Sequence, residues 1–64
     1  MIKVIQNPNM KEWFNVLGLD QIIDELKGQA NAMKKAERIA RKNGVDKILI
    51  ESNGEKKVLT ISPN

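Results

Sequence analysis

One helix lined with alanines limits most strongly what this chain can fold into. Between residues 29 and 43, apolar side chains recur at helical spacing and form one narrow stripe: Ala32, Met33, Ala36, Ile39 and Ala40. Because alanine is small, such a helix can lie close to a β-sheet and bury its stripe there. The Asn43-Gly44 pair that follows is typical of a helix end, since glycine readily takes the left-handed conformation needed there.

The strongest signal after the helix is Asn53-Gly54, which lies between the β-rich runs 48–50 and 58–61. Asn-Gly in such a place favours a hairpin with a two-residue loop. The loop fixes a register with these opposite residues: Ser52 and Glu55, Glu51 and Lys56, Ile50 and Lys57, Leu49 and Val58, Ile48 and Leu59. One face of the hairpin should then be core, through Ile48, Ile50, Leu59 and Ile61.

The other face of this hairpin carries Leu49 and Val58. One explanation is that the segment 20–27 covers them, or that they are simply exposed, as isolated apolar residues often are. The other explanation is a small dimer contact.

Two strands are expected near the N-terminus, over residues 2–6 and 12–17, with Asn7-Pro8-Asn9 as the turn between them. The short connection favours an antiparallel pair. Trp13 and Phe14 are neighbours on the second strand and therefore point to opposite faces. We expect Trp13 to pack against the helix or the last hairpin, with a surface position as the alternative.

The segment 20–27 fits more than one structure. Asp20 resembles a helix N-cap, and Ile22, Ile23 and Leu26 have helical spacing. A strand or a loop leading to the main helix fits as well. We favour a helical turn that ends before Gly28, because glycine costs about 1 kcal/mol inside a helix.

Together these elements predict one α+β domain over residues 1–64, with the order β-β-α-β-β and an extra short helix before the main one. The expected architecture is a two-layer sandwich: a four-stranded, mostly antiparallel sheet with the helix on one face.

The residue types argue against an enzyme. The chain has no histidine, cysteine or tyrosine, so the usual metal ligands, nucleophiles and bases are missing. There is no phosphate-binding glycine motif, and we expect no metal, no cofactor and no small-molecule substrate.

The apolar N-terminal stretch is too short for a signal peptide, and no segment is long enough to span a membrane. We therefore expect a cytoplasmic protein with no membrane partner.

What remains is binding. The net charge is +3, and the expected helix itself carries five basic residues: Lys34, Lys35, Arg38, Arg41 and Lys42. Our first hypothesis is a small interaction module that binds a protein partner or itself as a homodimer, with Leu49, Val58 and Trp13 as interface candidates. The second is a weak nucleic-acid binder without sequence specificity, in which the basic helix contacts phosphates. The alternative explanation of these basic residues is that they only form the solvated outer face of an ordinary helix.

Several short features resemble one family: Val4-x-x-Asn7-Pro8-Asn9, Trp13 with Val16, Ala32-x-x-x-Ala36-x-x-x-Ala40-x-x-x-Gly44, Ile48-x-Ile50, and Gly54. In these the chain is similar to the domain of unknown function 2188, a family of short prokaryotic proteins, some of them phage-associated. The resemblance covers residues 4–57 and implies strands that flank one helix. It implies no catalytic or binding residue.

Overall fold

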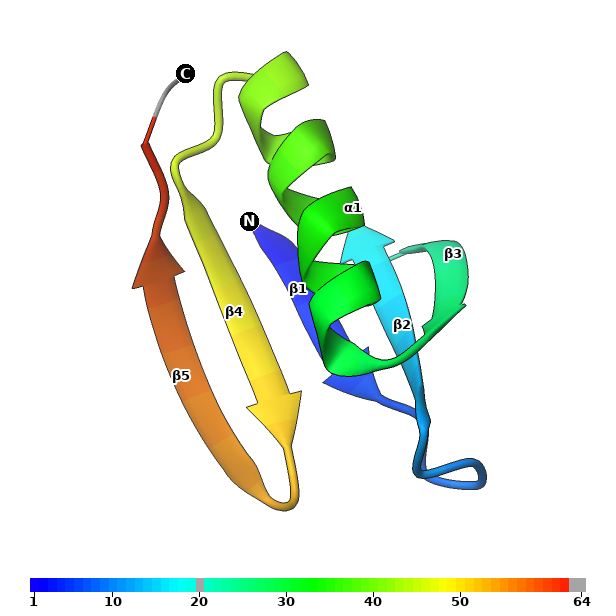
Figure 1. Ribbon diagram of the computed structural model, residues 1–64. Helices are drawn as coiled ribbons and strands as arrows, with labels where there is room; N and C mark the ends of the chain where they lie inside the picture. Colours follow the sequence, from blue (N-terminus) through cyan, green and yellow to red (C-terminus); the bar gives the residue numbers. More distant parts are fainter. Residues whose placement is uncertain (20, 63–64) are drawn as a thin grey trace.

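A computed structural model describes residues 1–19 and 21–62 of the chain. It is an α+β fold of two layers, a sheet with one helix packed on it (Figure 1). The elements in chain order are β1 (Ile2–Gln6), β2 (Trp13–Gly18), β3 (Gln21–Lys27), α1 (Gln29–Lys42), β4 (Lys47–Ser52) and β5 (Glu55–Thr60). The predicted fold class is confirmed.

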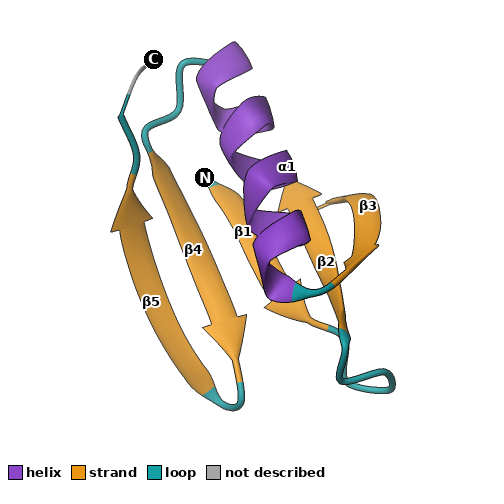
Figure 2. Cartoon of the chain, viewed as in Figure 1, coloured by secondary structure: helices purple, strands orange, loops and turns teal. Residues whose placement is uncertain are grey.

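The sheet has five strands in the order β3-β2-β1-β4-β5, so β1 is the central strand (Figure 2). Strands β1, β2 and β3 form an antiparallel meander. The helix then crosses the sheet and returns the chain to β4, which lies parallel to β1. Strand β5 pairs antiparallel with β4 and forms one edge, while β3 forms the other.

The alanine stripe holds the two layers together. Ala32, Ala36 and Ala40 are all 0% exposed, and they pack in one core with apolar side chains of the three inner strands. These are Ile2, Val4, Phe14, Val16, Ile48 and Ile50. The helix begins after Gly28 and ends at Lys42 with Asn43 as its C-cap, and Gly44 follows in the predicted left-handed conformation with φ +70°.

The C-terminal hairpin has the predicted register. Ser52 lies opposite Glu55, and Leu49 lies opposite Val58. Asn53 and Gly54 both have positive φ angles, 53° and 77°, which is the geometry that a two-residue loop of this kind requires.

The helical turn predicted for residues 20–27 is wrong, because residues 21–27 form the edge strand β3. The sheet therefore has five strands and not four. The apolar spacing misled because β3 carries a β-bulge opposite Val16 and Leu17, which interrupts the alternation of a regular strand. The proposed N-cap, Asp20, lies outside the described residues.

The core assignment of Leu59 is also wrong. Leu59 points to the helix side of the sheet, opposite Ile48, yet it is 40% exposed. Among the described residues the helix contacts β1, β2, β3 and β4 but not β5, so nothing covers the outer strand. Ile61, expected in the same core, is half-buried against it.

Trp13 does not pack against the helix as expected. Its neighbour Phe14 takes the helix side and is buried in the core, so Trp13 points to the other face. There Trp13 is half-buried and lies opposite Lys27 of the edge strand β3. Its strand is two strands away from β4 of the last hairpin, so Trp13 does not pack there either.

The close fit of the helix can be tested by enlarging one alanine. Ala36→Leu adds three carbons where the helix touches the sheet, and should lower the free energy of unfolding by about 1–3 kcal/mol. Urea unfolding followed by circular dichroism measures it. Ala30→Leu is the control, because Ala30 is exposed on the same helix. Equal stabilities for the two variants would contradict this account of the core.

Candidate functional site

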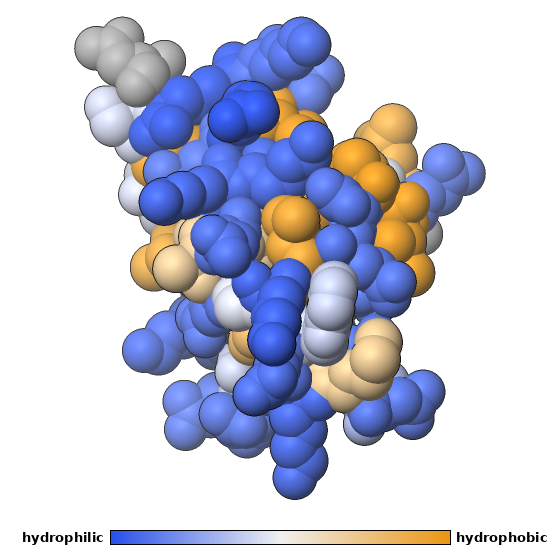
Figure 3. Space-filling view, turned by 45° about the vertical axis from the view of Figure 1, so that its right-hand side comes forward, coloured by the Kyte–Doolittle hydropathy of each residue, from blue (hydrophilic) through white to orange (hydrophobic). Residues whose placement is uncertain are grey.

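The candidate site is an apolar groove beside the second half of the helix. Its volume is ≈ 450 Å³, and it lies between the C-terminal part of α1, the start of β1 and the end of the β2–β3 hairpin. The residues that line it are Met1, Ile2, Gly18, Leu19, Ile23, Ile39, Asn43 and Val45. In the space-filling view hydrophobic side chains gather on this side, with hydrophilic ones around them (Figure 3).

Leu19 is the most unusual residue of the groove. It follows β2 in the hairpin turn, where its φ angle is +54°. Left-handed backbone costs a residue with a Cβ roughly 1–2 kcal/mol, and leucine has no side-chain hydrogen bond to compensate. Its side chain is also 91% exposed. The chain thus presents a large apolar side chain in a strained turn, at the mouth of an apolar hollow.

Gly18 shapes the floor beside Leu19. A Cβ at position 18 would lie 2.7 Å from Cδ1 of Ile23 and 3.5 Å from Cδ1 of Ile2. The missing side chain therefore leaves room for Ile23 to fold across the end of β2. Ile23 is still 48% exposed and Met1 is 58% exposed, so the groove is accessible to solvent.

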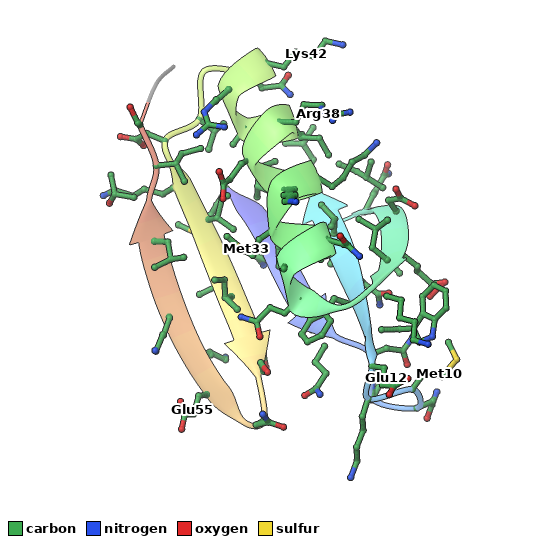
Figure 4. The ribbon with its side chains drawn as sticks, viewed as in Figure 1. Met10, Glu12, Met33, Arg38, Lys42 and Glu55 are labelled. Carbon is green, nitrogen blue, oxygen red and sulfur yellow. The ribbon has the colours of Figure 1, made fainter. Side chains whose placement is uncertain are left out.

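One side of the groove is basic. Lys35, Ile39 and Lys42 share a helix face at spacing i, i+4, i+7. This face is turned toward β3, because Lys35 Nζ lies 3.9 Å from Asp24 Oδ2. Lys42 is exposed and makes no ion pair within the described residues. Arg38 and Lys42 both project from the helix on the side away from β5 (Figure 4).

The five basic residues of the helix therefore do not form one stripe. Lys35 and Lys42 border the groove, whereas Lys34, Arg38 and Arg41 follow the outer side at spacing i, i+4, i+7. Arg41 is held by Glu37 Oε1 at 3.4 Å and by the carbonyl oxygen of Ser62 at 3.1 Å. Lys34 and Arg38 are exposed and unpaired among the described residues.

The predicted interface residues Leu49, Val58 and Trp13 lie on one common surface, the face of the sheet opposite the helix, which we call the open face. Two rows of its side chains cross all five strands. The apolar row is Ile22, Leu17, Lys3, Leu49 and Val58, and the polar row is Glu25, Asn15, Ile5, Glu51 and Lys56. Leu49 and Val58 are neighbours in the apolar row, while Trp13 lies nearer the other end of the strands. The segment 21–27 covers neither Leu49 nor Val58, because it forms the edge strand on the opposite side of the sheet.

The described residues contain no group of three or more carboxylate, histidine or cysteine side chains that could hold a metal ion. They also contain no helix with the length and apolar character needed to cross a membrane. Sequence reasoning missed the groove. The available signal was Leu17-Gly18-Leu19, a run of apolar residues leading into a turn, where polar residues are usual.

The strain at Leu19 gives a test of the turn. Leu19→Asn should raise the free energy of unfolding by about 1 kcal/mol, because asparagine tolerates left-handed backbone better than leucine does. Thermal or urea unfolding measures the change. Leu19→Ala is the control, because it also removes the exposed leucine. Alanine has a Cβ but no polar group that favours left-handed backbone, so the free energy of unfolding should not rise. A destabilised Leu19→Asn would contradict the strained turn.

Comparison with known proteins adds no relative: no family model, no curated protein and no solved structure matches this chain. The resemblance to the domain of unknown function 2188 stays a prediction.

Proposed function

We propose that this protein is a non-enzymatic binding module that holds apolar side chains of a partner protein in the groove between the helix and the β2–β3 hairpin. Leu19 carries the proposal. Its strained backbone and its 91% exposed side chain both disfavour the isolated molecule. A partner that buries this leucine recovers about 1.5–3 kcal/mol of hydrophobic free energy.

The groove's dimensions support this use. A hollow of ≈ 450 Å³ is in the size range of sites that hold ligands, and its lining is mostly aliphatic. Such a lining offers few hydrogen-bond partners, with Asn43 the one polar side chain among the lining residues. It therefore suits leucine-like or aromatic side chains from a protein better than a polar metabolite.

The charges beside the groove indicate the partner's chemistry. Lys42 is an exposed cation that borders the groove, and Lys35 borders the same side. The nearest described carboxylate on β3, Asp24, is already paired with Lys35. A partner segment with acidic residues next to its apolar ones would match both properties. We therefore infer an acidic amphipathic segment as the occupant.

A peptide display experiment tests this. Random peptides are selected on the wild-type protein after depletion on Leu19→Asn, and the enriched peptides are titrated into labelled protein by NMR. We expect apolar anchors flanked by aspartate or glutamate, and shifts of the Ile23, Ile39 and Val45 amides. Leu19→Asn should bind these peptides about tenfold more weakly although its fold is intact, since one buried leucine is lost.

Leu59→Asn is the matched control, because it removes another exposed leucine, on the far edge strand. It should leave peptide affinity unchanged. Selection of no peptide, or shifts outside the groove, would refute the proposal.

The same spectra test the second candidate function. Duplex DNA and single-stranded RNA are added at low and at physiological salt. Lys34 and Arg38, exposed on the outer helix face, would be the first phosphate contacts. Shifts there that fade with salt, without any groove peptide, would make weak nucleic-acid binding the better account.

A further inference from the structure

We propose that two copies of this chain associate through their open faces, with the two-fold axis along β1. This surface is opposite the groove, so the proposal is independent of the proposed function. It rests on how the strand order and the side-chain rows of the open face match their own rotated copy.

The strand order is symmetric about β1, with two strands on each side. A two-fold rotation about an axis parallel to β1 places β4 of the second copy over β2, and β5 of the second copy over β3. It also keeps each row at its own height along the strands. The apolar row therefore meets the apolar row, and the polar row meets the polar row.

In the apolar row this brings aliphatic side chains together. Leu17 faces Leu49 of the second copy, and Ile22 faces Val58 of the second copy, with both contacts repeated by symmetry. Ile22 and Val58 are 59% and 54% exposed in the single chain, so both have surface to lose. The two Lys3 side chains meet at the axis, where Glu51 of the second copy lies one strand and one row away.

In the polar row the rotation matches opposite charges. Glu25 on β3 faces Lys56 of the second copy, and Lys56 faces its Glu25, while the two Ile5 side chains meet at the axis. Both Glu25 and Lys56 are exposed. They lie on opposite edge strands, four strand spacings or about 19 Å apart, so they do not pair within one chain.

An axis across the strands gives a poorer match. With such an axis midway between the two rows, each strand would face its own copy with the rows exchanged, so Leu49 would face Glu51 and Ile22 would face Glu25 of the second copy. Carboxylates would be placed over aliphatic side chains. The pairing of Glu25 with Lys56 and of aliphatic with aliphatic side chains thus favours the axis along β1 over this arrangement, with the slight rotation usual for stacked sheets.

The footprint sets the strength of association. Five strands are about 19 Å across, so the two rows and their neighbours cover roughly 400 Å² of each copy. A stable protein interface buries about 800 Å² per partner. The dimer should therefore be weak and should dissociate on dilution, with half-dissociation in the micromolar range or above.

A charge-exchange experiment tests the pairing, with sedimentation and NMR tumbling times measured over a dilution series. Glu25→Lys and Lys56→Glu should each raise the dimer dissociation constant about tenfold, since each places like charges opposite one another twice. Mixing the two variants should restore wild-type affinity, because both contacts between the unlike copies are then attractive. Neither substitution touches the core, so both variants should fold.

Lys57→Glu is the matched control: it changes a lysine on the helix side of the same strand and should leave the dissociation constant unchanged. A wild-type chain that stays monomeric at millimolar concentration overturns the proposal. So does a mixture no tighter than either variant alone. An equal loss in Lys57→Glu and Lys56→Glu would point to edge pairing of β5 and would also overturn it.

Discussion

The contact between three alanines and the sheet determines most of what this molecule presents to solvent. Ala32, Ala36 and Ala40 are fully buried, so the helix backbone lies close to the inner strands. A helix is about 10–12 Å wide, whereas the outer strands of this sheet are about 19 Å apart. One helix cannot cover that width, and here it covers β1 to β4 and leaves β5 bare. The helix side of β5 is uncovered because a single closely packed helix is narrower than the sheet.

The apolar groove and the open face are the two surfaces that this single helix leaves uncovered. On the β3 side, a groove lined by Ile23 and Ile39 lies between the bulged edge strand and the second half of the helix. On the other side of the sheet the residues 1–19 and 21–62 form no second layer, so the alternate side chains of the strands stay half-buried or exposed. The apolar side chains of these 64 residues leave both surfaces open. The proposed partner segment and the proposed second copy would each cover one of them.

The parts of the fold that local signals determine were predictable. The helix over Gln29–Lys42 and the hairpin around Asn53-Gly54 depend on periodicity and turn chemistry within a few residues, and both were correct. The strand β3 was not predictable, because a bulge gives Ile22, Ile23 and Leu26 a spacing that also fits a helix. Exposure of Leu59 depends on the width of the sheet, and the groove joins residues from Met1 to Val45. Neither property is contained in any local stretch of sequence.

The two proposed surfaces have a joint consequence, because they lie on opposite sides of the sheet. If the open faces pair, both helices point outward, and each copy keeps its groove free on the helix side. The dimer would then carry two identical grooves facing away from each other. A partner with two acidic amphipathic segments, or two linked partners, would bind such a dimer with avidity although each groove alone is weak. Weak dimerisation would in turn be strengthened by any bivalent partner, since binding to the dimer favours the dimer. The apparent affinity for a bivalent partner would then rise with the concentration of this protein. A monomeric protein with the same groove would not show that dependence.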